Sequence, residues 1–362
     1  MSSAEHILSV LNAVVDPEIG RDWGSLKALR ELRMDGDIVS CRLVLPFPAR
    51  SRHDAMVAGL QQALRHFNPQ LQLNVIVEQQ IEAHTVQRGL TPLPGVRNVI
   101  AVASGKGGVG KSTTAVNLAL ALAAEGAKVG VLDADIYGPS QPQMLGLNGQ
   151  KPNSPDGKSI EPLLAHGLQA MSIGFLIDAD QPMVWRGPMV TQALMQLLND
   201  TKWQDLDYLV VDLPPGTGDI QLTLSQKIPV TGAVVVTTPQ DIALLDARKG
   251  IRMFEKVGIP ILGIVENMAV HVCSNCGHAE PIFGEGGGAG LSEEYHVSLL
   301  GQLPLEMHIR LAADSGAPTV VSAPDSLAAQ TYRKIARSVA IKVSERAKDF
   351  SARMPKIVIR NS

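Results

Sequence analysis

The sequence predicts an α/β protein with a doubly wound, mostly parallel sheet and a small α/β domain at its N-terminus. From residue 98 onward, short runs rich in β-branched residues alternate with longer segments of helical character, which is the order that parallel sheets require. Residues 1–85 show the same mixture on a smaller scale, before a stretch rich in Gly and Pro. Aromatic residues make up only 4% of the chain, so Ala, Leu, Val and Gly must fill the core.

Composition excludes several classes of function. The 362 residues suffice for two domains, and a formal net charge of -3 without a basic block argues against a general nucleic-acid binder. No apolar stretch approaches the length of a membrane span, and the first residues lack the pattern of a signal peptide. Three cysteines cannot form a disulfide framework in a chain this long, which indicates a reducing cytoplasm. We therefore expect a cytoplasmic protein with no nucleic-acid partner and no membrane partner.

Residues 1–85 are predicted to form the small α/β domain. Cys41 lies inside a predicted strand, where a small packed core residue is favoured over a ligand. The region resembles the metal–sulfur cluster assembly domain, which has an Asp-Pro-Glu near its start, here Asp16-Pro17-Glu18. That family commonly carries a cysteine after a Pro-Ala pair, but here Arg50 follows the pair. Apolar residues from Ile7 to Val14 have helical spacing and predict a first helix. The other predicted elements are a strand over Asp37–Leu45, a helix over Ala55–Phe67 and a strand over Gln72–Val77.

The larger domain is predicted to span residues 98–347, with a linker at 86–97 and a tail at 348–362. Each of its strands is a short apolar run followed by polar or Gly-rich residues. The predicted strands are Val99–Ala103, Lys128–Leu132, Tyr208–Val211, Ala233–Thr237, Ile261–Val265 and Leu299–Leu303. The predicted helices are Ala115–Glu125, Met189–Leu198, a segment from Asp241 to Val257, and Asp325–Ala347.

A Gly-rich loop follows the first of these strands and leads into a helix. The order of strand, loop and helix, with the spacing G-x-x-x-x-G-K-S, is typical of a phosphate-binding loop, although a Gly-rich turn without a ligand is the alternative. Lys111 would reach the β- and γ-phosphates of ATP, and the Ser112 hydroxyl would bind Mg²⁺. The residues expected to surround the phosphates are Gly105, Lys106, Gly107, Gly108, Val109, Gly110, Lys111, Ser112 and Thr113.

Lys106 is a second lysine within this loop. Because Lys111 occupies the space at its own phosphates, Lys106 is better placed to act on a nucleotide bound by a second subunit, as an arginine finger does. The loop resembles the deviant phosphate loop of the nitrogenase-iron-protein and MinD/ParA class of ATPases. This resemblance implies a homodimer.

Carboxylates follow two of the predicted strands, at the sheet edge where α/β proteins bind ligands. Asp133 would support the Mg²⁺ shell and Asp135 would orient the attacking water, with a pair of solvated loop aspartates as the alternative. Asp212 ends its strand as a Walker-B carboxylate does when it holds Mg²⁺ through water, and residues 214–219 would sense the γ-phosphate. In this ATPase class an Asn at the position of Asn267 faces the adenine, although Asn267 could equally be a turn residue.

Cys273 and Cys276 form a single Cys-x-x-Cys pair. Such pairs occur in zinc sites, redox motifs and iron–sulfur ligation. His271 and His278 could complete a zinc site within one chain, and an inert pair is a further alternative. Two ligands per chain, doubled by a two-fold axis, would instead supply the four thiolates of a [4Fe–4S] cluster.

Together, the phosphate loop, residues 133–140, residues 212–219 and the Asn-Met before the cysteine pair resemble the Mrp/ApbC family of iron–sulfur cluster carrier ATPases. The resemblance implies an ATP-hydrolysing homodimer that binds a cluster, receives it from assembly factors and transfers it to recipient apoproteins. The main alternative is a MinD/ParA-like switch that uses ATP for positioning or partitioning. The cysteine pair favours the carrier.

Overall fold

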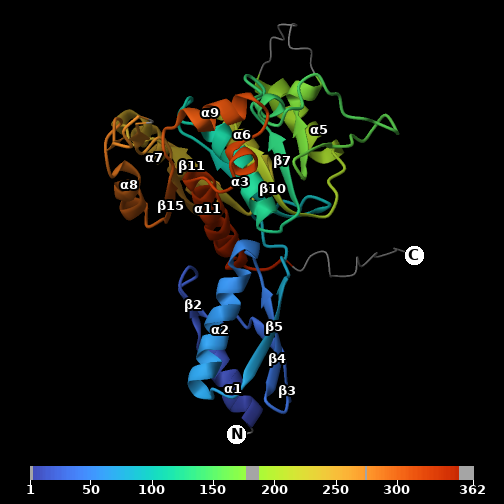
Figure 1. The fold of residues 1–362 in the computed structure, drawn as a ribbon. Coiled ribbons are helices and arrows are strands. Elements are labelled where there is room, and N and C mark those ends of the chain that lie inside the picture. The colour runs from blue at the N-terminus through green and yellow to red at the C-terminus, as the bar shows by residue number, and fades with distance from the viewer. Residues whose placement is uncertain (1–2, 177–186, 274, 350–362) are drawn as a thin grey trace, which may run out of the picture. The chain divides into compact units, whose positions relative to one another are not determined.

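The structure is a computed structural model that describes residues 3–176, 187–273 and 275–349 (Figure 1). It divides into two compact units. The N-terminal unit contains the chain up to Ile81 together with Ala124–Gly126, and the C-terminal unit contains the remainder. Within the described residues, no helix combines the length and the apolar character needed to cross a membrane.

The N-terminal unit is a three-stranded sheet with two helices. The order is β3-β4-β5, with β4 antiparallel to β3 and parallel to β5. Helix α2 packs on β5, and α1 packs on α2 and β3. The bounds are α1 Ser3–Asn12, β1 Val15–Asp16, β2 Arg21–Asp22, β3 Leu29–Asp35, β4 Ile38–Leu45, η1 Arg50–Arg52, α2 His53–Phe67 and β5 Gln72–Gln79.

Two features of this unit differ from the sequence prediction. The first helix ends at Asn12 rather than continuing to Val14, because Val15 and Asp16 pair with β2 in a short hairpin. Strand β3 was not predicted, since its residues are mostly charged and its side chains are only partly covered.

The C-terminal unit is built on an eight-stranded sheet with the order β15-β12-β11-β6-β10-β7-β9-β8. All neighbouring strands are parallel except β8, which is antiparallel to β9. Strands that follow β6 lie on both sides of it, so the loop after β6 is at a topological switch point, where doubly wound sheets bind ligands. The bounds are β6 Val96–Ala103, β7 Val129–Asp133, β8 Leu163–Ala165, β9 Leu168–Ser172, β10 Leu206–Asp212, β11 Gly232–Thr237, β12 Ile261–Glu266 and β15 Leu299–Gln302.

The helices cover this sheet. Helix α7 packs on β11, α8 on β12, and α11 on β12 and β15 (Figure 1). Helix α3 is buried along most of its length, which explains its Ala- and Leu-rich sequence. The bounds are α3 Lys111–Ala124, α4 Gln141–Met144, η2 Ile173–Phe175, α5 Gly187–Asp200, α6 Asp219–Lys227, α7 Asp241–Lys256, α8 Gly287–Tyr295, α9 Met307–Asp314, α10 Thr319–Ser322 and α11 Leu327–Ser344.

The six predicted strands of this unit are all present, and the doubly wound, mostly parallel sheet is confirmed. The hairpin of β8 and β9 was not predicted. Strand β6 begins at Val96, within the stretch predicted as linker, because Val96 pairs with Leu206 of β10. Lys348, at the start of the predicted tail, pairs with His84 in an isolated bridge.

Candidate functional site

The Gly-rich loop lies at the carboxyl end of β6 and leads directly into α3. Its residues line a cavity of about 340 Å³ that also includes Asp135, Pro215 and Met268. The structure therefore brings the predicted phosphate loop together with the predicted water-orienting carboxylate and part of the predicted switch. Lys106 is exposed and makes no ion pair with any residue that the structure describes.

A buried ion pair links the loop to β10. The Lys111 ammonium contacts the Asp212 carboxylate, and only 6% of the lysine side chain is exposed. Lys111 Nζ also lies 3.2 Å from Ser112 Oγ. Gln141 completes this group, because its Nε2 donates to Asp212 Oδ2 at 3.0 Å and to the Ser112 carbonyl at 3.1 Å. Gln141 was not predicted as a site residue, and no motif in the sequence points to it.

Asp133 is fully buried beside Asp212. Its carboxylate accepts the backbone N–H groups of Asp135, Ser140 and Gln141 at 3.0–3.1 Å. Burial and the neighbouring charge of Asp212 raise its pKa, against the effect of these donors. The geometry thus shows Asp133 holding the loop that carries Asp135. Ser172 of β9, a further contact at 3.2 Å, was missed because β9 was not predicted.

Asp135 itself is half-buried, and desolvation raises the pKa of its carboxyl group. Two oxygens nearby, Ser140 Oγ and Gln141 Oε1, are buried without a hydrogen-bond partner among the described residues. Together with Ser112 Oγ and Asp212, the side-chain ligands available here are oxygens, the ligand type that Mg²⁺ prefers. The residues present therefore fit a magnesium ion.

Asn267 follows the end of β12 and faces the phosphate loop. Its Nδ2 donates to the Val109 carbonyl at 2.9 Å, and its backbone N–H donates to Thr237 at 2.7 Å. A Cβ atom on Gly110 would lie only 2.1 Å from Asn267 Nδ2, and Gly110 has a φ of +80°. The next residue, Met268, has a φ of +56°, which is uncommon for a residue other than glycine.

The cysteine pair lies on a short hairpin formed by β13 (His271–Val272) and β14 (Ala279–Glu280). The backbone N–H of Cys273 donates to His278 at 2.9 Å, and Gly277 donates back to Cys273 at 2.8 Å. Cys273 is half-buried and Cys276 is exposed. Hydrogen bonding from the backbone of Cys276 and Asn275 lowers the pKa of the Cys273 thiol, which favours the thiolate that metals bind.

Among the described residues, no group of three or more His, Cys, Asp or Glu side chains is arranged to hold a metal ion. His271 instead places its Nδ1 at 3.2 Å from the Leu305 carbonyl. The zinc site within one chain, with His271 and His278 as ligands, therefore finds no support in this part of the structure. The candidate metal ligands on this hairpin are therefore the thiols of Cys273 and Cys276.

The N-terminal unit shows no comparable thiol site among its described residues. Cys41 is 4% exposed in β4, and burial raises the pKa of its thiol to about 11, as expected for a packed core residue. The Asp-Pro-Glu segment forms ion pairs with Arg52, at 3.6 Å from Asp16 and 3.4 Å from Glu18. Asp16 Oδ1 also accepts the N–H groups of Glu18 and Ile19, so this segment has a structural role.

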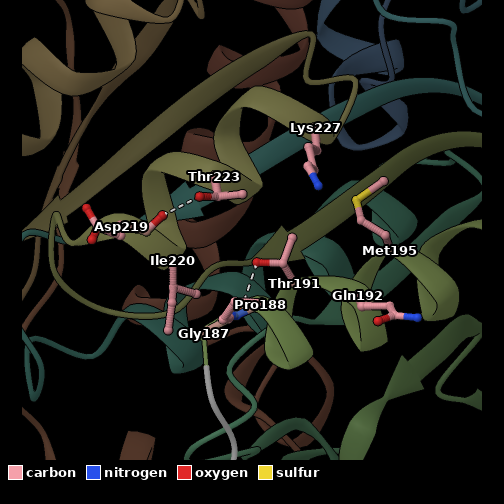
Figure 2. A pocket seen from close by; sticks show the side chains of 9 residues that line it. All are labelled: Gly187, Pro188, Thr191, Gln192, Met195, Asp219, Ile220, Thr223 and Lys227. Carbon is pink, nitrogen blue, oxygen red and sulfur yellow. Dashed lines mark hydrogen bonds between the residues drawn. The ribbon is translucent and has the colours of Figure 1, made fainter.

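A second cavity, of about 740 Å³, lies between α5 and α6 (Figure 2). The Thr223 hydroxyl donates to the Asp219 carbonyl at 2.6 Å, and the Thr191 hydroxyl donates to Gly187 at 3.3 Å, so both are engaged within their own helices. The residues that line this cavity include none from the phosphate loop. We therefore do not assign the nucleotide to it.

Comparison with known proteins agrees with this geometry. Residues 95–340 match the family described as NUBPL iron-transfer P-loop NTPase, and residues 4–73 match that described as iron-sulfur cluster assembly protein. A protein of Escherichia coli K12 named iron-sulfur cluster carrier protein is 56% identical over 90% of this chain and 88% of its own. A mouse protein named iron-sulfur cluster transfer protein NUBPL is 54% identical over 70% of this chain and 81% of its own.

Among solved structures, a nucleotide-binding protein from Archaeoglobus fulgidus in complex with ADP is 40% identical, with a TM-score of 0.55. The match covers 61% of this chain and 87% of that chain. These findings confirm the resemblance that the motifs indicated. The chain belongs to the NUBPL iron-transfer P-loop NTPase family, together with the iron–sulfur cluster carrier proteins.

Proposed function

We propose that this protein is an ATP-hydrolysing carrier that binds an iron–sulfur cluster through Cys273 and Cys276 and passes it to apoproteins. The observation that carries the proposal is the position of the two thiols. They lie on a hairpin that begins four residues after Asn267, whose amide contacts the phosphate loop. A soft-metal ligand pair and a nucleotide site therefore share one segment of chain.

For the nucleotide reaction, Lys111 neutralises charge on the β- and γ-phosphates, and the backbone of residues 105–113 surrounds them. Ser112 and Asp212 would hold Mg²⁺, which would supply further positive charge at the phosphates. Asp135 orients the attacking water, and Asp133 keeps the loop that carries Asp135 in place. Asn267 contributes to the contact with the adenine.

The active form is a homodimer. Lys106 is an exposed residue of the phosphate loop, and in a face-to-face pair it would reach the nucleotide of the partner. The same two-fold axis brings two hairpins together. Two thiols from each chain then supply the four thiolates that a [4Fe–4S] cluster requires.

The alternative, a MinD/ParA-like positioning switch, leaves the hairpin thiols without a purpose, and the family match and the named relatives favour cluster transfer. A carrier of this kind works in the cytoplasm, where thiols stay reduced. Its partners are cluster assembly factors, which load it, and the apo forms of iron–sulfur proteins, which it supplies.

Serine variants of the hairpin test the proposal. Serine keeps the size of cysteine but is a poor ligand for cluster iron, so Cys273→Ser and Cys276→Ser should lose the visible absorbance and iron content after anaerobic reconstitution. Basal ATP hydrolysis should remain, because neither thiol lines the phosphate-loop cavity. Cys41→Ala is the matched control, and it should keep the cluster. A full complement of iron in both serine variants would contradict the assignment.

A further inference from the structure

Glu266, the last residue of β12, is completely buried, and neither a motif nor the proposed reaction accounts for it. Its Oε2 accepts the backbone N–H of Gly288 at 2.6 Å, in the first turn of α8. Its Oε1 makes no hydrogen bond with any described residue. A carboxyl group is costly to bury, so its retention with a single side-chain hydrogen bond calls for an explanation.

The hydrogen bond from Gly288 to Glu266 closes a loop in the chain. The segment between them, residues 267–287, contains the whole cysteine hairpin. The side chain of Glu266, which precedes the segment, thus binds Gly288, which follows it, and so holds the two ends of the segment together. Beyond Glu266, Ala269 donates to Leu303 at 2.9 Å and Leu305 donates to Val270 at 2.8 Å, so the near arm of the hairpin is held as well.

The near end of the same segment touches the nucleotide site. Because consecutive residues in an extended chain point to opposite sides, Glu266 faces α8 while Asn267 faces the phosphate loop. Met268 then turns the chain toward the hairpin in a left-handed conformation, and it lines the phosphate-loop cavity. Such a conformation persists only where the surrounding contacts impose it.

We propose that Glu266 is a positioning residue that transmits nucleotide occupancy to the cysteine hairpin. A nucleotide that engages Asn267 and Met268 acts on one end of the segment, and the hydrogen bond to Gly288 makes the other end move with it. Without that bond, the far end of the segment follows α8, which packs on α7 and β12, and no hydrogen bond from Glu266 ties it to the nucleotide end. This inference rests on the proposed nucleotide and thiol sites, but it requires no bound cluster.

Hydrogen exchange of the full-length, cluster-free protein tests it, with and without Mg²⁺ and a non-hydrolysable ATP analogue. In the wild type, the analogue should slow exchange across residues 271–280 by about fivefold or more, the scale of an ordinary coupling between sites. Glu266→Ala should bind the analogue yet lose this effect. Glu266→Gln should retain it, because an amide oxygen also accepts the Gly288 N–H.

Two further variants make the result specific. Gly288→Ala acts from the donor side: its added methyl group would lie 2.3 Å from Glu266 Oε2 and so displaces the carboxylate from the Gly288 N–H, and it should reproduce the loss even if Glu266→Ala does not fold. Glu293→Ala removes an exposed carboxylate from the same helix and should behave as the wild type. The inference is wrong if the wild type shows no slowing, if Glu266→Ala keeps it, or if Glu266→Gln loses it. None of these results bears on whether the thiols bind a cluster.

Discussion

At the scale of single residues, the surroundings of each thiol decide its chemistry. Cys41 is packed in β4, where burial raises its pKa, whereas backbone donors in the hairpin lower the pKa of Cys273. The thiolate is the form that reacts and binds metal, so only the hairpin offers a ligand at neutral pH. A cysteine in the N-terminal unit is thus no substitute for the pair at 273 and 276.

This difference predicts the outcome of alkylation. Burial raises the pKa of Cys41 to about 11 and backbone donors lower the pKa of Cys273, so at neutral pH a much larger fraction of Cys273 should be thiolate. Iodoacetamide at pH 7, followed by peptide mass spectrometry of the cluster-free protein, should label Cys273 and spare Cys41. The urea-unfolded chain, in which all three thiols are exposed, is the control. Equal labelling of Cys273 and Cys41 in the folded protein would show that Cys41 is not buried, or that the Cys273 thiol is not activated, as the structure indicates.

The site residues that could be predicted from the sequence are those that belong to a motif. Lys111, Asp212 and Asp135 were predicted from their spacing from a strand and a Gly-rich loop, and the structure brings them together at one cavity. Gln141, Ser172 and Glu266 were not, since each acts through a tertiary contact with a residue far along the chain. No local pattern distinguishes such a polar residue from one on the surface.

At the scale of elements, the long apolar strands of the parallel sheet were predictable because burial on both faces gives them a continuous run of apolar residues. The exceptions are short or partly exposed: β3 is mostly charged, and β8 has three residues. The phosphate loop is the element where sequence and packing agree most closely. Gly110 must be glycine both for its φ of +80° and for the approach of Asn267.

Gly110→Ala tests this fit between two elements. The added methyl group meets Asn267 Nδ2 and the left-handed backbone adds strain of about 1–2 kcal/mol, so nucleotide affinity should fall by about tenfold or more. Gly149→Ala is the matched control, because Gly149 has a φ of +73° and a methyl group added there would meet no atom within 4 Å. It should show comparable strain in thermal unfolding but unchanged affinity in a nucleotide titration. Unchanged affinity in Gly110→Ala would mean that the loop does not hold the phosphates in this conformation.

At the scale of the whole molecule, the proposed cluster site and the proposed trans lysine both require two chains acting together. Lys106 is an exposed residue of the phosphate loop, and each hairpin contributes two thiols. A homodimer gives both features a partner through one symmetry axis. The sequence predicted a homodimer from Lys106 and the cysteine pair. The structure of a single chain shows the geometry of one subunit of that dimer.

Mixing two inactive variants tests the trans arrangement. In a heterodimer of Lys106→Ala with Asp135→Ala, one site has its own Asp135 and the partner's lysine, whereas the other site lacks both. An equal mixture in which half the dimers are mixed should recover about a quarter of wild-type ATP hydrolysis. Native mass spectrometry verifies the exchange of chains. If heterodimers form and hydrolysis stays at the level of the separate variants, Lys106 does not act across the interface.

The central claim, a cluster shared between two chains, is tested most directly by counting iron and labile sulfide in reconstituted protein of known mass. A [4Fe–4S] cluster held by Cys273 and Cys276 of both chains predicts about two irons and about two sulfides per chain, in a particle of two chains. The same absorbing species should be absent from either serine variant. About four irons per chain in a particle of one chain would contradict the account.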